Sequence, residues 1–336
     1  MSGASGPASG NDGGRPPKAP SSQGRPAKAP SSQGRPSKAL SSRARTRLAA
    51  GTLLTPFFAL FTVAMIVPVA YALWLSLFTE KQSGLGFDGP RTVFDGLGNY
   101  AAALGDQAFR EGFWVLLGYC AFYIPLMGGG AIVLALLLDT ALARARRFFQ
   151  LALFLPHAIP GLIAALIWIY LYTPQLSPVV AAMEAGGIGF DFFSEGTLPS
   201  IVNIALWEWL GYNVVIFYAA LQAVDRSLLE AATVDGAGNW RIAFSIKLPL
   251  IRSSLVMVLL FTIIGSLQLF TEPLILSRGS GSAVTSTWTP NMYAYSAAFE
   301  RNDYGLAAAA SVLIALVAAV LSFAVTRFTN RKEARP

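Results

Sequence analysis

Three ionisable residues stand inside stretches of sequence that are otherwise almost free of charge. Glu208 and Glu272 are acids, and His157 is the single histidine of the chain, placed between Pro156 and Pro160. Ionisable groups at membrane depth usually face a cavity or a partner group, because an isolated charge is costly in hydrocarbon. His157 therefore either lines a cavity near a proline kink or packs against a carbonyl that Pro160 frees. Glu208 and Glu272 are each candidates for a functional role, and the alternative for Glu272 is a position at the outer interface.

Two stripes of small, polar and aromatic residues recur at the three- or four-residue spacing of one helix face. The first is Asn203, Trp207, Gly211, Val214 and Tyr218, and the second is Thr262, Gly265, Ser266, Leu269 and Glu272. Hydrogen-bonding groups beside aromatic faces suit a polyol site, whereas small residues also suit close helix packing. Both interpretations stay open. The candidate residues for a substrate path are His157, Trp207, Gly211, Thr262 and Ser266.

Catalytic motifs are missing from the sequence. There is no GxxxxGK[ST] phosphate loop, no HExxH pair and no GxSxG elbow. The single cysteine, Cys120, cannot form an internal disulfide. We therefore expect neither an enzyme nor a metal or cofactor bound by this chain itself.

The elements that would position these residues are long apolar spans. The chain of 336 residues is 54% hydrophobic and only 13% charged, whereas about a quarter of the residues in a soluble protein are charged. A helix needs about 20 mostly apolar residues to cross a bilayer. Six segments qualify: Leu53–Leu77, Phe113–Leu138, Phe148–Tyr172, Leu198–Val224, Ser253–Leu276 and Leu306–Val325. The sequence predicts an all-α integral membrane protein with six transmembrane helices.

The N-terminal part of the chain is of a different kind. Residues 1–46 are rich in Gly, Pro, Ser and Ala, and a ten-residue repeat begins at Gly14, Gly24 and Gly34. With almost nothing to bury, this basic tail is expected to be disordered. The domain boundaries follow: a tail over residues 1–46, a membrane domain over 47–330 and a short cytoplasmic tail over 331–336.

Lysine and arginine are distributed unevenly between the two sides of the spans. Twenty of them fall in the two tails and in the second and fourth loops, and five fall on the other side. Because basic residues collect on the cytoplasmic side, both termini are expected in the cytoplasm. The chain is then a multi-pass protein of the cell (plasma or inner) membrane.

The fourth loop, residues 225–250, has the pattern of two short helices. Ser227 and Glu230 have the spacing of a capping box, and Asp235–Gly236 predicts a break. Asn239 is a candidate cap for the second helix. Small and apolar residues exposed at the cytoplasmic surface call for a covering surface, supplied either by a partner or by the chain's own membrane domain.

This loop carries a resemblance. Glu230, Ala231, Ala232, Asp235, Gly236 and Ala237, followed by Ile246, Leu248 and Pro249, resemble the EAA loop of binding-protein-dependent ABC importer permeases of type I. Further stretches resemble the sugar branch, in particular the maltose-type first permease. They are GLGNY from Gly96, FLPHAIP from Phe154, AALQ from Ala219 and AAFERNDYGLAAA from Ala297.

The resemblance implies a mechanism. The EAA loop docks into a separate ATPase dimer, which binds ATP and Mg, and the ATPase-coupling residues are Glu230, Ala231, Ala232, Asp235, Gly236, Ala237 and Pro249. The implied partners are that ATPase dimer, a second permease subunit, an extracytoplasmic solute-binding protein and membrane lipids, without nucleic acid. The implied function is ATP-driven import of a sugar, oligosaccharide or related polyol. The alternatives are an ion-coupled secondary transporter, expected to show more intramembrane acids or an inverted repeat, and a polytopic membrane enzyme.

Overall fold

The computed structural model describes residues 42–82, 90–140, 145–279 and 282–333. The chain forms two compact units, Met1–Ala59 and Leu60–Pro336. In the first, the described part belongs to helix α1 (Ser42–Phe61). Residues 42–46, which we assigned to the tail, are therefore helical, and the rest of the tail lies outside the described residues.

The second unit begins with helical segments that continue from α1 and lead into a β-hairpin. A π-helical turn, η1 (Thr62–Ile66), precedes α2 (Val67–Leu75), where Pro68 occupies the first helical turn, a position that proline tolerates. Strands β1 (Phe78–Gln82) and β2 (Pro90–Phe94) then pair antiparallel. The sequence-based assignment did not predict this hairpin.

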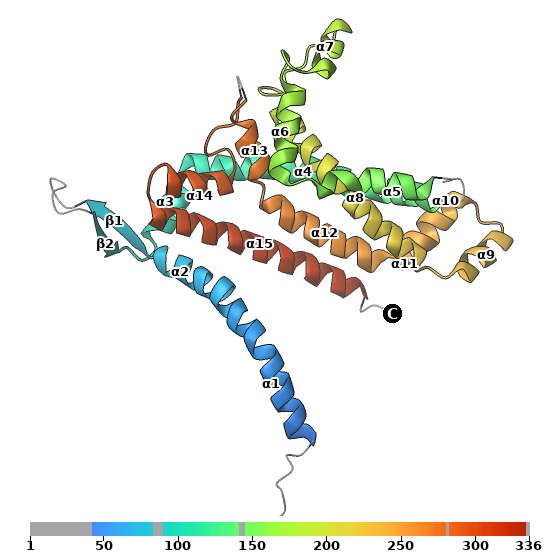
Figure 1. The fold of residues 1–336 in the computed structure, drawn as a ribbon, viewed down its shortest axis with the longest axis horizontal. Coiled ribbons are helices and arrows are strands. Elements are labelled where there is room, and N and C mark those ends of the chain that lie inside the picture. The colour runs from blue at the N-terminus through green and yellow to red at the C-terminus, as the bar shows by residue number, and fades with distance from the viewer. Residues whose placement is uncertain (1–41, 83–89, 141–144, 280–281, 334–336) are drawn as a thin grey trace, which may run out of the picture. The chain divides into compact units, whose positions relative to one another are not determined.

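The remaining elements are helical and follow in chain order (Figure 1). The first group is α3 (Gly98–Gly105), α4 (Gln107–Asp139), α5 (Arg146–Phe154), η2 (Leu155–Ala158), α6 (Gly161–Tyr172) and α7 (Pro178–Ala185). The second group is α8 (Thr197–Gln222), α9 (Arg226–Val234), α10 (Asn239–Ile242), η3 (Ala243–Lys247) and α11 (Leu248–Leu250). The last group is α12 (Arg252–Leu267), α13 (Thr271–Leu276), α14 (Pro290–Phe299) and α15 (Tyr304–Glu333).

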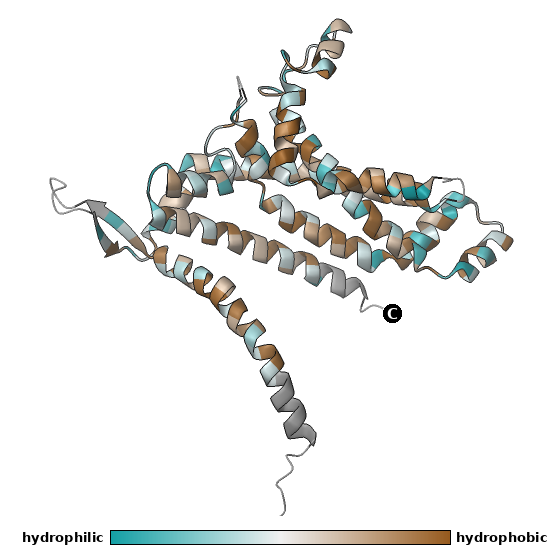
Figure 2. Cartoon of the chain, in the orientation of Figure 1, coloured by the Kyte–Doolittle hydropathy of each residue, from teal (hydrophilic) through white to brown (hydrophobic). Residues whose placement is uncertain are grey.

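The core of the second unit is built on α4 and α8, which form its most extensive helix pair. One cluster of buried apolar residues joins them to α6, α12 and α13, and another joins them to α11 and α12. A third connects α3, α4, α14 and α15. Hydrophobic residues run along the long helices, while hydrophilic residues gather near helix ends, as around α9 (Figure 2).

The membrane-length segments agree with the predicted spans. Among the described residues, five have the length and composition to cross a membrane: Gly51–Leu75, Gln107–Asp139, Thr197–Gln222, Arg252–Leu276 and Tyr304–Arg327. The pair Arg146–Ala158 and Gly161–Tyr172 passes the same test as one segment, and counting it gives the six predicted spans. The all-α membrane prediction is confirmed.

The third span is sharply broken where the sequence predicts a proline kink. Its two halves meet at an angle of 98°. Ile159 adopts extended angles, φ −84° and ψ 130°, because the ring of a following proline disfavours helical geometry. Pro160 also has no N–H to continue the helical ladder. The break gives α6 its own N-terminus inside the bundle.

Candidate functional site

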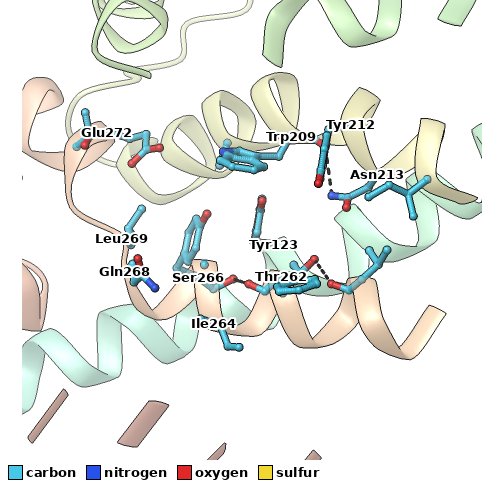
Figure 3. A pocket seen from close by; sticks show the side chains of 17 residues that line it. Tyr123, Trp209, Tyr212, Asn213, Thr262, Ile264, Ser266, Gln268, Leu269 and Glu272 are labelled. Atoms are coloured by element: carbon cyan, nitrogen blue, oxygen red, sulfur yellow. Dashed lines mark hydrogen bonds between the residues drawn. The ribbon is translucent and has the colours of Figure 1, made fainter. Parts of the chain in front are cut away.

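A cavity of about 470 Å³ opens between α4, α8 and α12 and the start of α13. Figure 3 shows its polar and aromatic side chains, with Glu272 at one end and Asn213 at the other. The lining residues are Tyr119, Tyr123, Ala205, Trp209, Tyr212, Asn213, Ile216, Val258, Phe261, Thr262, Ile264, Gly265, Ser266, Gln268, Leu269, Thr271 and Glu272. A volume of this size holds a small organic molecule.

Helix α12 contributes small and hydroxyl-bearing residues. The Ser266 hydroxyl donates to the Thr262 carbonyl oxygen at 2.6 Å, and the Thr262 hydroxyl donates to the Val258 carbonyl oxygen at 2.8 Å. Each hydroxyl therefore donates its hydrogen to a carbonyl of its own helix, and its oxygen can still accept a hydrogen bond from a solute. This helix also lines the cavity with the apolar side chains of Val258, Phe261 and Ile264.

Helices α8 and α4 contribute aromatic faces and an amide. Tyr119 and Tyr123 of α4 stack with ring centroids 4.9 Å apart and an interplanar angle of 14°. The Asn213 amide donates to the Trp209 carbonyl oxygen at 3.2 Å. Aromatic rings beside hydroxyl and amide groups match the apolar faces and hydroxyl edges of a sugar-like solute.

Of the five residues that we predicted for a substrate path, two line the cavity and three do not. Thr262 and Ser266 line the cavity, as do all the other members of their stripe. The ring of His157 lies behind the wall, with its centroid 4.6 Å from those of Trp209 and Tyr212.

Trp207 and Gly211 are not among the lining residues. Trp207 packs edge-on against Trp168, with ring centroids 5.8 Å apart. Gly211 faces the broken span. Direct participation of Trp207, Gly211 and His157 in a substrate path stays a prediction.

The sequence-based search missed the lining face of α8. Ala205, Trp209, Tyr212, Asn213 and Ile216 form that face, at the same helical spacing as the stripe we selected. It also missed Tyr119 and Tyr123, although their four-residue spacing on a predicted span was a readable signal.

Gly211 has a packing role that its structure makes explicit. A Cβ atom at this position would lie 1.7 Å from the carbonyl oxygen of Leu153. The missing side chain therefore allows the backbone of α8 to touch the backbone of the broken span. A side chain here would force the two helices apart.

We expect Gly211→Ala to destabilise the protein by roughly 3 kcal/mol, the upper range for overpacking a close contact. The thermal midpoint and the amount of folded protein in the membrane should both fall. Gly118→Ala on α4 is the matched control, because no atom lies within 4 Å of its added Cβ. Equal thermal midpoints for the two variants would contradict this packing role.

Three polar atoms of the broken span and of the neighbouring helix α8 are buried. Within the described residues, His157 Nδ1, Trp168 Nε1 and Glu208 Oε2 are buried without a hydrogen-bond partner. Glu208 is only 7% exposed, and its Oε1 would lie 3.2 Å from a Cβ atom placed on Gly161, the first residue of α6. The positive end of that helix favours a nearby acid, which helps to explain why an acid is tolerated at this depth.

The fourth loop folds as the two short helices expected, with different caps. The Asp225 side chain accepts from the Ser227 backbone N–H at 2.9 Å and begins α9. This bond holds the pKa of the Asp225 carboxyl below its usual value. The capping box of Ser227 and Glu230 was therefore the wrong cap. The prediction that Asn239 caps the second helix was wrong as well. The N-cap of α10 is Gly238, and no side chain caps this helix.

The predicted break between the two helices is confirmed. Helix α9 ends at Val234, and Gly236 has φ +82°, a left-handed angle that favours glycine. Beyond the turn, Trp240 and Phe244 stack with ring centroids 5.5 Å apart. Val234, Trp240 and Phe244 are 88%, 78% and 54% exposed, so this surface offers apolar area to a partner.

An ion pair ties the end of this loop to the core helices. The Lys247 ammonium pairs with Asp139 Oδ2 at the end of α4, and their side chains are 17% and 9% exposed. The Gln222 amide at the end of α8 donates to Asp139 Oδ1 at 2.6 Å. One carboxylate therefore joins α4, α8 and the segment that follows the Gly236 turn.

Taken together, the fold and the site define a membrane transport subunit: a bundle of membrane-length helices, an internal polar and aromatic cavity, and an exposed helix pair at one end. The family described as "binding-protein-dependent transport system inner membrane component" matches residues 131–334. The chain belongs to this family.

Curated relatives agree over most of the chain. The sn-glycerol-3-phosphate transport system permease protein UgpA of Escherichia coli O157:H7 is 29% identical over 282 residues, covering 83% of this chain and 93% of the relative. The UgpA protein of Yersinia pseudotuberculosis serotype I (strain IP32953) is 30% identical, covering 83% and 94%. These relatives are transport permeases, and this chain is likewise a transport subunit and not an enzyme.

Two solved structures share the fold. A bacterial ABC transporter involved in the import of the acidic polysaccharide alginate matches with a TM-score of 0.73 and 21% identity, covering 85% of this chain and 96% of that chain. A bacterial alginate ABC transporter in complex with an alginate pentasaccharide-bound periplasmic protein matches with a TM-score of 0.75 and 20% identity, covering 88% and 98%.

Proposed function

We propose that this chain is a permease subunit of an ATP-driven importer that moves a sugar, an oligosaccharide or a related polyol across the cell membrane. The observation that carries the proposal is the cavity, where the aromatic side chains of Tyr123 and Trp209 line the same space as the hydroxyl-bearing residues Thr262 and Ser266. The names of the relatives support it, because they concern a polyol phosphate and a polysaccharide.

Energy enters through the coupling loop, residues 225–250. Glu230, Ala231, Ala232, Asp235, Gly236 and Ala237 form the last part of α9 and the turn after it, and Pro249 lies in α11, before α12. An ATPase dimer, which binds ATP and Mg, covers the exposed apolar residues of the loop. Movement of the docked loop reaches α4 and α8 through the Lys247–Asp139 pair and reaches α12 directly along the chain.

Two further partners complete the importer. An extracytoplasmic solute-binding protein delivers the sugar, and a second permease subunit forms the other half of the pathway. The alginate transporter of the same fold has been solved with a periplasmic protein that carries a pentasaccharide, which supports this assembly.

Deletion of the gene in its source organism tests the proposed function. The initial uptake rate of a labelled sugar should fall at least tenfold, should recover with the wild-type gene, and should leave amino acid uptake unchanged. A panel of labelled mono- and oligosaccharides measured beside a labelled amino acid gives the answer. Loss of amino acid uptake with every sugar still imported would refute the proposal.

From the charge distribution we infer that both termini are cytoplasmic, and single cysteines test this orientation. In a Cys120→Ala background, a cysteine at Gly187, in the loop after α7, should react with a membrane-impermeant maleimide on intact cells. A cysteine at Ser21 should react only after the cells are permeabilised. The reverse labelling pattern would overturn the orientation.

A further inference from the structure

We propose that the cavity selects solutes without negative charge, so that this chain serves a neutral or amino-bearing sugar and rejects sugar phosphates and uronates, with Glu272 as the residue that sets this preference. The inference rests on the proposed sugar path through the cavity. It separates this chain from relatives whose names concern glycerol phosphate and an acidic polysaccharide.

One lining side chain of the cavity is acidic, and none of its described lining residues is basic. Of the 17 lining residues, which are all in the described part of the chain, none is lysine, arginine or histidine, and Glu272 is the one carboxylic acid. The other polar groups are hydroxyls and amides, including Asn213, Ser266 and Gln268. Hydroxyls and amides satisfy the hydroxyl groups of a neutral sugar as donors and acceptors. They do not supply the charge that phosphate and carboxylate sites in proteins usually take from arginine or lysine.

Glu272 disfavours an anion in either protonation state. When ionised, its carboxylate repels a second negative charge across a partly buried space, where screening is weaker than in water. When protonated, it carries no positive charge that could pair with the anion and offset the cost of removing the anion from water.

The position of Glu272 suits a selective role. It lies on the stripe of α12 and α13 that faces the cavity, six residues after Ser266. In Figure 3 its side chain stands at the same end of the cavity as Leu269 and Gln268. A solute that contacts Tyr123 and Trp209 therefore occupies the same cavity as this carboxyl group.

Trp209 allows the field in the cavity to be measured without transport. Its side chain is 40% exposed and lines the cavity, so its fluorescence reports collisions with ions there. The experiment uses the complete importer in nanodiscs and takes the difference between the wild type and Trp209→Phe as the Trp209 signal. Iodide, caesium and uncharged acrylamide are the three quenchers.

We expect acrylamide and caesium to quench the Trp209 signal and iodide to quench it about tenfold less, because fields in such clefts change local ion concentrations on this scale. Glu272→Gln should reduce the preference for caesium, and Glu272→Arg should reverse it. Glu184→Gln, an exposed acid on α7, is the matched control and should change nothing. Iodide quenching equal to caesium quenching in the wild type would overturn the proposal.

The same signal also tests the solute. Glucose should change the Trp209 signal at a concentration at least tenfold lower than glucose 6-phosphate does, and Glu272→Arg should remove this difference. Equal half-saturating concentrations in the wild type would overturn the proposal. Because ion quenching needs no transported sugar, failure of the charge test leaves the importer proposal standing, and failure of sugar uptake leaves the charge test valid.

Discussion

Gly236→Val is expected to abolish uptake while the protein still reaches the membrane. Gly236 has φ +82°, an angle that a β-branched residue does not adopt without strain. The strain amounts to roughly 1–2 kcal/mol. The chain can relieve it only by forming a different turn between α9 and α10. The surface that we propose for ATPase docking then changes shape, although no residue of a predicted span is altered.

The measurement is uptake together with the amount of ATPase that co-purifies with the permease. Gly238→Ala is the matched control two residues away, because its φ is −72° and no atom lies within 4 Å of an added Cβ. It should retain uptake and ATPase recovery. Wild-type behaviour of Gly236→Val in both assays would remove the proposed role of the turn.

Two further changes address the same loop. Gly236→Asp should give a milder form of the valine defect, because aspartate enters left-handed angles more readily than a β-branched residue.

Glu230→Lys reverses a charge on the exposed surface of α9 and should weaken ATPase docking without a change in the turn. Co-purification at several salt concentrations separates the two causes, since only the charge effect is screened.

Ser266→Trp is expected to stop transport by filling the cavity. Ser266 lines the cavity with a side chain that is 2% exposed, and indole adds a large rigid group to a space of about 470 Å³. Uptake should fall to background, whereas recovery of the ATPase should stay near the wild-type level because the coupling loop is unchanged. Both Ser266→Trp and Gly236→Val should lose uptake, but only Gly236→Val should also reduce the recovery of the ATPase.

Leu259→Trp on the same helix is the control, because Leu259 is 39% exposed and does not line the cavity. Thermal midpoints of both variants show whether the helix still packs. Uptake at the wild-type rate by a folded Ser266→Trp protein would place the transport path elsewhere and would return the stripe of α12 to a packing role.

The amino-acid sequence by itself determined the spans, the break between the two short helices of the fourth loop and one wall of the cavity. Long uncharged runs predict membrane helices whatever their neighbours are, because hydrocarbon accepts few other structures. Asp235–Gly236 predicts the break in the loop, since a left-handed turn is a local property of the backbone. The stripe from Thr262 to Glu272 predicts one face of α12 and α13, and every member lines the cavity.

Tertiary packing decided which face of α8 lines the cavity. Two faces of this helix carry aromatic and polar residues at helical spacing, so periodicity alone does not distinguish the stripe of Trp207 and Gly211 from that of Trp209 and Asn213. The choice is made by the 98° break in the third span. That break brings the Leu153 carbonyl against Gly211, a contact that only glycine permits, and it leaves Trp209 and Asn213 to line the cavity.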